Sequence, residues 1–173
     1  MNKKNLTIKE TFALAYQNHQ KNNLRVAENL YNEILKINPN HFESIFLLGS
    51  LSLQTKKFDA AIQLFYKAIE IRPEHADTHY NLGILHQKLG QYQNAVSSYK
   101  EAIRIKPNFA DAHYNLGATY YKLGQYKEVI ASSKEAIRIK PNFGNAYLNL
   151  GLAFRKSGSY DEAIASYKKA ILV

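Results

Sequence analysis

The sequence predicts an all-α fold made of five copies of one helix-turn-helix repeat, and three observations lead to this prediction. The four prolines of the chain fall 34 residues apart, and a set of leucines and glycines keeps the same interval. Residues 76–109 and 110–143 agree at 23 of 34 positions, which identifies them as copies of one repeat. Within a repeat, apolar and small residues recur at spacings of three and four, which is typical of a helix face and not of a strand.

Each repeat reads in order as a helix, a tight turn, a second helix and a proline. In residues 76–109, a break at Lys88-Leu89-Gly90-Gln91 separates the two apolar runs, and Pro107 closes the second run. After an N-terminal tail of residues 1–7, the chain is therefore expected to form one domain, 8–173. Its expected repeats are 8–41, 42–75, 76–109, 110–143 and the incomplete 144–173.

Several residues are suited to capping the predicted helices. Thr7 followed by Glu10 has the spacing of a capping box at the start of the first helix. An asparagine follows three of the prolines, and we expect it to cap the helix that comes next. These residues are Asn40, Asn108 and Asn142.

Small residues mark the places where the helices of a repeat approach closely. Glycine recurs in the first helix of four repeats although each glycine costs about 1 kcal/mol of helix propensity relative to alanine. Two departures from the pattern predict local differences. Ala15 replaces the helix glycine in the first repeat, and Asn22 and Lys56 replace the turn glycine in the first two repeats, so the N-terminal half should be less regular. Val129 and Ser133 replace an alanine and an aromatic residue, so the fourth repeat should be packed more loosely. The recurring glycines are Gly49, Gly83, Gly117 and Gly151.

This pattern resembles the tetratricopeptide repeat, and the resemblance covers residues 8–173. It implies a right-handed α-solenoid in which the first helices of the repeats line a concave groove. In that family such grooves bind proteins or peptides, so the resemblance also implies an interaction scaffold. The family pattern is matched in the third repeat by His79, Leu82-Gly83, His86, Gly90-Gln91-Tyr92, Ala95, Tyr99, Ala102 and Pro107.

One face of each first helix packs against its neighbours, and the opposite face is left free. In the third repeat Asp77, Asn81, Ile84 and Lys88 are spaced by four, three and four residues, so they share this free face. The equivalent residues of successive repeats would form rows along the groove. The predicted groove residues are Phe46, Asp77, Tyr80, Asn81, Ile84, Lys88, Asp111, Tyr114, Asn115, Lys122, Leu148, Asn149 and Lys156.

Asn81, Asn115 and Asn149 form one of these rows. A side-chain amide both donates and accepts hydrogen bonds, so such a ladder can hold the backbone of an extended peptide of any sequence. The alternative is that these asparagines bond only to adjacent helices, and the sequence leaves both interpretations open. The repeated Asn-Leu-Gly resembles the asparagine ladder of O-linked N-acetylglucosamine transferases, and this resemblance concerns the groove alone.

The polar residues do not form a recognisable catalytic arrangement. His79 and His86 lie seven residues apart and share a helix face, which is one requirement of a metal site, but they occupy packing positions of the repeat. The chain has no cysteine, and no phosphate-binding loop, nucleophile elbow or His-Glu metal helix motif is present. The sequence therefore predicts a protein that is not an enzyme and that needs no metal or cofactor.

The charge and hydropathy of the chain limit its surroundings and partners. The net charge is +9, and six basic residues recur on the second helices. Exposed aromatic residues are not interleaved with them, which disfavours nucleic-acid binding. No apolar run approaches the roughly 18 residues of a membrane span, so we expect a cytoplasmic protein that does not enter membranes. The basic residues are Lys100, Arg104, Lys106, Lys134, Arg138 and Lys140.

The fifth repeat stops at Ile171-Leu172-Val173, before its proline position and without a polar closing helix. Repeat arrays normally end in a polar cap, so we expect an exposed apolar surface that self-associates or continues into a longer protein. Two functions follow. The first is a non-catalytic scaffold that binds a peptide segment or partner protein in the groove. The second is the N-terminal docking arm of a larger bacterial transferase, with its catalytic domain outside this chain.

Overall fold

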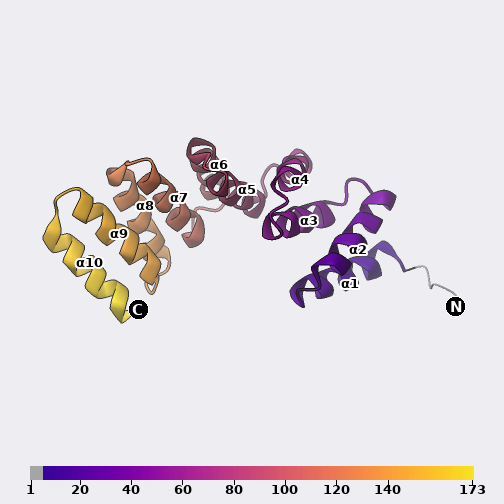
Figure 1. Cartoon of the computed structure of the whole chain (residues 1–173), viewed down its shortest axis with the longest axis horizontal. Coiled ribbons are helices and arrows are strands. Elements are labelled where there is room, and N and C mark those ends of the chain that lie inside the picture. The colour runs from indigo at the N-terminus through magenta and orange to yellow at the C-terminus, as the bar shows by residue number, and fades with distance from the viewer. Residues whose placement is uncertain (1–5) are drawn as a thin grey trace. The chain divides into compact units, whose positions relative to one another are not determined.

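The computed structural model describes residues 6–173, which form ten α-helices and no strand (Figure 1). The predicted all-α helical-repeat fold is thereby confirmed. Of the expected tail, residues 1–5 lie outside the described residues. Within residues 6–173, no helix has the length and hydropathy that a membrane span requires. The helices are α1 (Ile8–Gln20), α2 (Leu24–Ile37), α3 (Phe42–Gln54), α4 (Phe58–Ile71), α5 (Ala76–Lys88), α6 (Tyr92–Ile105), α7 (Ala110–Lys122), α8 (Tyr126–Ile139), α9 (Gly144–Lys156) and α10 (Tyr160–Leu172).

The helices divide into two compact units. The N-terminal unit ends at Glu74 and contains α1–α4, and the C-terminal unit begins at His75 and contains α5–α10. Inside each unit every helix packs on the next one along the chain. In the C-terminal unit α7 also contacts α5 and α9, so the first helices of three consecutive repeats lie side by side.

The same turn joins the two helices of all five repeats. Its central residue has a positive φ, and the amide of the next residue donates to a carbonyl in the last helical turn. Glycine occupies the position three times, whereas Asn22 has φ 61° and Lys56 has φ 60°. Their turns contain the same hydrogen bond, 2.9 Å from Asn23 to Asn18 and 2.8 Å from Lys57 to Ser52. The two turns without glycine therefore have the same geometry as the three that contain it.

Replacing Lys56 by glycine is expected to stabilise the N-terminal unit by about 1 kcal/mol, because a left-handed conformation strains a residue with a Cβ. The matched control is Gly90→Ala, which should lose about the same amount. A Cβ at Gly90 would meet no atom within 4 Å, so backbone strain alone would account for the loss. Urea denaturation followed by circular dichroism measures the stability of both variants. A lower unfolding midpoint for Lys56→Gly than for the wild type would contradict the assignment of backbone strain to Lys56.

At the N-termini of the helices, the predicted capping box is confirmed, whereas the predicted asparagine caps are wrong. The hydroxyl of Thr7 accepts from the Glu10 amide at 3.2 Å and the Glu10 carboxylate accepts from the Thr7 amide at 2.8 Å, which is the expected capping box. The asparagines after the prolines, however, do not cap. They lie one residue too early, because the N-cap residues of α3, α7 and α9 are His41, Phe109 and Phe143.

In three repeats an aromatic ring of the second helix lies directly against the glycine of the first helix. A Cβ built on Gly83 would lie 2.6 Å from Tyr99, and one on Gly151 would lie 2.6 Å from Tyr167. Gly49 has the same relation to Phe65, at 2.8 Å. No heavy atom can approach a methyl group this closely, so a larger residue at these positions would force the ring or the helix to shift.

The fourth repeat is packed more loosely, as the sequence predicted. A Cβ on Gly117 would have its nearest neighbours at 3.4 Å, in Ser132 and Ser133, which is ordinary contact. Ser133 stands where the other repeats carry the ring, and its buried hydroxyl has no hydrogen-bond partner in the described chain. The α7–α8 contact is therefore both less tightly filled and less well satisfied than the α5–α6 contact.

Candidate functional site

Four rows of side chains cross the three first helices of the C-terminal unit, and we call this surface the α5–α7–α9 face. Twelve of the thirteen predicted groove residues belong to it. Phe46 instead lies on α3 in the N-terminal unit, where its ring is 6.2 Å from that of Phe42 and 6.4 Å from that of Phe65. The face consists of Asp77, Tyr80, Asn81, Ile84 and Lys88 on α5, Asp111, Tyr114, Asn115 and Lys122 on α7, and Leu148, Asn149 and Lys156 on α9.

A hydrogen bond between neighbouring repeats fixes the centre of this face. The Asn115 amide nitrogen donates to the Tyr80 hydroxyl at 2.9 Å. The Tyr80 ring packs against those of Phe109 and Tyr99, with centroids 4.7 and 5.9 Å away. Burial raises the pKa of Tyr80, and so does the nearby Asp111 carboxylate, while the Asn115 bond acts in the opposite direction. Tyr80 is therefore a neutral, half-buried phenol held in one orientation.

The next repeat carries the same arrangement of rings. Tyr114 packs against Phe143 with centroids 5.0 Å apart. The amide nitrogen of Asn149 is buried and has no hydrogen-bond partner within residues 6–173. Sequence reasoning missed Phe109 and Phe143 as supports of this face, although they recur at the same 34-residue interval as the tyrosines. Both phenylalanines are N-cap residues and lie outside the three- and four-residue spacing of the helices, so the helical pattern does not reveal them.

Opposite charges border the face along its two edges. Asp77 and Asp111 are exposed in the first turns of α5 and α7, and the basic row is exposed at the other ends of the helices. Eleven residues separate the two edges on each helix, which is roughly 16 Å at the helical rise. Each sign of charge also lies at the helix end whose dipole favours it. The basic row is Lys88, Lys122 and Lys156.

The histidines lie in packing positions and do not gather into a metal site. His79 and His86 are both buried, and His86 Nδ1 lies 2.7 Å from the Gln91 side-chain oxygen. Among the described residues, no group of three or more histidine, cysteine, aspartate or glutamate side chains could hold a metal ion.

The basic residues of the second helices are engaged with neighbouring side chains. Arg138 donates to Glu135 at 2.8 Å, three residues earlier on the same helix, and its guanidinium also reaches Asn108 at 3.5 Å. Lys106 and Lys140 lie over the rings of Phe109 and Phe143, at 4.5 and 4.8 Å from the centroids. These cations therefore also stabilise the rings that support the α5–α7–α9 face.

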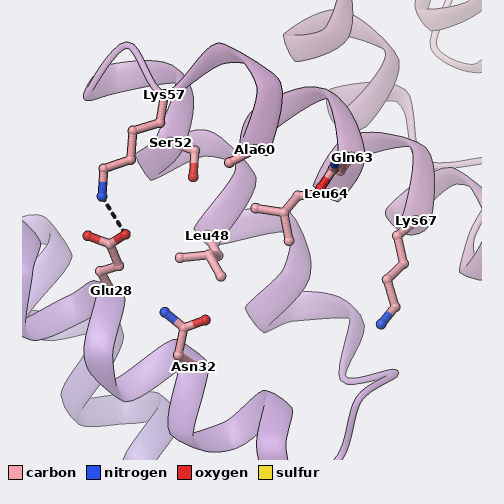
Figure 2. Close-up of a pocket in the computed structure, with 9 residues that line it drawn as sticks. All are labelled: Glu28, Asn32, Leu48, Ser52, Lys57, Ala60, Gln63, Leu64 and Lys67. Carbon is pink, nitrogen blue, oxygen red and sulfur yellow. Dashed lines mark hydrogen bonds and ion pairs between the residues drawn. The ribbon is translucent and has the colours of Figure 1, made fainter.

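A separate pocket of about 360 Å³ lies in the N-terminal unit, between α2, α3 and α4 (Figure 2). Figure 2 shows the ion pair of Lys57 and Glu28, 2.6 Å long, on one side of the pocket and Lys67 on the other. Sequence reasoning did not find this pocket, although a serine at a position that is aromatic in later repeats was a usable signal. The pocket is lined by Glu28, Asn32, Leu48, Ser52, Lys57, Ala60, Gln63, Leu64 and Lys67.

Family models for repeat proteins match most of the chain. A TPR repeat model matches residues 87–124, and the tetratricopeptide repeat model matches 110–143 and 144–173. A model of anaphase-promoting complex, cyclosome, subunit 3, matches residues 17–102. The solved structure of MamA is 30% identical, with a TM-score of 0.86, and the match covers 91% of this chain and 92% of that one. The chain belongs to the tetratricopeptide repeat family.

Other tetratricopeptide repeat structures share the fold at lower identity. MamA from Desulfovibrio magneticus RS-1 is 20% identical with a TM-score of 0.87, over 95% of this chain and 93% of that one. YrrB, described as a TPR protein with an unusual peptide-binding site, is 21% identical with a TM-score of 0.81, over 95% and 85% of the two chains. No curated protein matches the sequence. In tetratricopeptide terms, the α5–α7–α9 face is formed by the first helices of three consecutive repeats.

Proposed function

We propose that this chain is a non-catalytic protein-interaction scaffold that binds an extended peptide segment, or a partner protein, on the α5–α7–α9 face. Membership of the tetratricopeptide repeat family supports the general role. The fold shared with YrrB, itself described as a peptide-binding TPR protein, supports it further. The finer assignment rests on the side chains of the face.

The observation that carries the proposal is the partly used hydrogen-bonding capacity of Asn115. One amide hydrogen of Asn115 is bonded to Tyr80, which fixes the plane of the amide. Its side-chain oxygen accepts no hydrogen bond from the described residues and stays available to a peptide amide. A donor and an acceptor held in a fixed orientation bind with less loss of entropy than mobile ones. Asn115 is therefore compatible with both interpretations, because its bond to the neighbouring helix leaves the rest of the amide for a ligand.

The spacing of the rows suits an extended segment that runs across the three helices. Packed helices lie about 10 Å apart, and an extended chain rises about 3.3 Å per residue, so the asparagines would meet every third residue. Segments with basic residues facing Asp77 and Asp111, and acidic residues facing the lysine row, would be preferred. Each direct hydrogen bond contributes about 1 kcal/mol, so the tyrosine rings are needed to reach micromolar affinity.

Replacing both Tyr114 and Asn115 by alanine is expected to weaken peptide binding roughly 30-fold, because an aromatic contact and a hydrogen bond worth about 2 kcal/mol together are lost. The measurement selects binders from a displayed random peptide library on the wild-type chain and compares affinities by fluorescence anisotropy. The control replaces Gln93 and Asn94, exposed residues of α6, by alanine. If both double variants keep their helicity and bind the peptide with equal affinity, the α5–α7–α9 face is not the binding site.

The apolar end of α10 leads to a separate expectation about self-association. Ile171 is 83% exposed and Leu172 is 77% exposed. We expect the chain to associate at micromolar concentrations, and expect Ile171→Lys with Leu172→Lys to shift it to the monomer, since two charges would oppose burial of this surface. Sedimentation velocity tests this expectation, and an unchanged mass distribution would contradict it.

A further inference from the structure

The pocket of the N-terminal unit occupies a position in the repeat where later repeats place a ring. Ser52 on α3 corresponds, at successive intervals of 34 residues, to a histidine, a tyrosine and a phenylalanine. Ser52 is only 2% exposed, and Figure 2 shows its hydroxyl directed into the pocket, toward Leu48. A serine therefore stands in the wall of this pocket where the equivalent groove of the C-terminal unit has the ring of Tyr120. The corresponding residues are His86, Tyr120 and Phe154.

One wall position of the pocket is aliphatic where the equivalent position of the C-terminal unit is polar. Leu64, which lines the pocket, corresponds to serine in each later repeat. Together with Leu48 it presents apolar surface on two sides of the pocket (Figure 2). A flat apolar group that enters between them would bury this surface, and ring-sized groups gain most from such burial.

The charge of the opening is reversed relative to its counterpart. The equivalent groove between α6, α7 and α8 is lined by Tyr120 and by the acidic residues Glu128 and Glu135. In the N-terminal unit these acidic positions are Ala60 and Lys67. A negatively charged ligand group that is repelled in the counterpart groove is therefore attracted here.

Lys67 is the cation available to such a group. Lys57 is already paired with Glu28 at 2.6 Å, which closes one end of the pocket. Lys67 lies across the pocket from this pair and has no acidic partner among the described residues (Figure 2). The amide of Asn32 lies between the two ends and can bond to a peptide backbone.

We propose that this pocket binds the aromatic side chain of a partner protein, with the carboxylate of an adjacent acidic residue placed at Lys67. The proposal rests on the scaffold function proposed above, because it supplies that function with a second protein-binding site. It is nevertheless separate from the α5–α7–α9 face, since every residue that lines it precedes Glu74.

Nuclear magnetic resonance of the ¹⁵N-labelled full chain tests the site with the peptide acetyl-Gly-Tyr-Glu-Gly-amide. We expect saturable shifts of the Ser52, Leu64 and Lys67 amides. Replacing the tyrosine of the peptide by alanine should weaken binding at least tenfold, and replacing its glutamate by glutamine about threefold. Lys67→Ala should have the same effect as the glutamine peptide, whereas Lys36→Ala, a change of an exposed lysine on α2, should have none.

Two variants of the chain separate filling of the pocket from a loss of folding. Ser52→Phe should abolish the shifts by restoring the ring of the later repeats. Ala60→Glu changes an exposed residue to the one found at Glu128 and Glu162, so it should weaken binding at least fivefold without disturbing the core. Binding retained in a folded Ser52→Phe chain or in Ala60→Glu, or shifts confined to residues after His75, would overturn the proposal. The Tyr114 and Asn115 double variant should bind this peptide normally, so failure of the face and failure of the pocket are distinguishable.

Discussion

Replacing Gly83 by alanine is expected to lower the free energy of unfolding of the C-terminal unit by about 2–3 kcal/mol, whereas the same change at Gly117 should raise it by up to about 1 kcal/mol. A methyl group on Gly83 would lie 2.6 Å from the fully buried Tyr99 ring, which has no room to move. At Gly117 the nearest atoms lie at 3.4 Å, so the gain in helix propensity prevails. The two glycines occupy the same position of neighbouring repeats, so each serves as the control for the other.

Urea denaturation and amide hydrogen exchange measure the stability of the Gly83→Ala and Gly117→Ala variants. Exchange is informative because repeat arrays open locally, and the loss at Gly83 should be largest in α5 and α6. Equal urea unfolding midpoints for the two variants would show that the contact with the Tyr99 ring does not determine whether alanine is tolerated at this position.

The second large effect is expected for Tyr99→Ser, which makes the α5–α6 contact resemble the α7–α8 contact. Removing a fully buried ring leaves a cavity and should cost about 3–5 kcal/mol. The change also removes a weak hydrogen bond, 3.3 Å long, from the Tyr99 hydroxyl to the Gln87 side chain. Thermal unfolding monitored by circular dichroism gives the loss, and a cost below about 1 kcal/mol would mean that neighbouring side chains collapse into the space.

Combining the two substitutions isolates their interaction. If the Tyr99 ring is what excludes a methyl group at Gly83, the loss caused by Gly83→Ala should disappear in the Tyr99→Ser background. The double variant would then be no less stable than Tyr99→Ser alone. Additive losses would instead point to a different cause for the glycine, such as backbone conformation.

The 34-residue period predicted the fold because the same physical requirement recurs in every repeat. Gly83 and Tyr99 are opposite sides of one contact, and the sequence shows both at a fixed separation. The loose fourth repeat was predictable for the same reason, since Ser133 breaks the pairing. The helix starts were less predictable, because Asn108 and Phe109 differ by one position and only backbone geometry decides which of them caps α7.

The period assigns twelve of the predicted groove residues to α5, α7 and α9, whereas the contacts that support them did not follow from the pattern. The bond from Asn115 to Tyr80 joins residues 35 positions apart, and periodicity gives the helix face of each residue but not its rotamer. The pocket was missed for a different reason. Ser52, at a position that is aromatic in later repeats, is only a weak match to the repeat pattern. Whether a pocket forms beside it depends on how Leu64 packs.

A crystal structure of the chain with a library-selected peptide would show whether the α5–α7–α9 face binds peptides. We expect an extended peptide that crosses α5, α7 and α9, with its backbone bonded to the amides of Asn81, Asn115 and Asn149. A peptide bound only to the outer surface of α6, α8 and α10, with those amides uninvolved, would contradict this expectation.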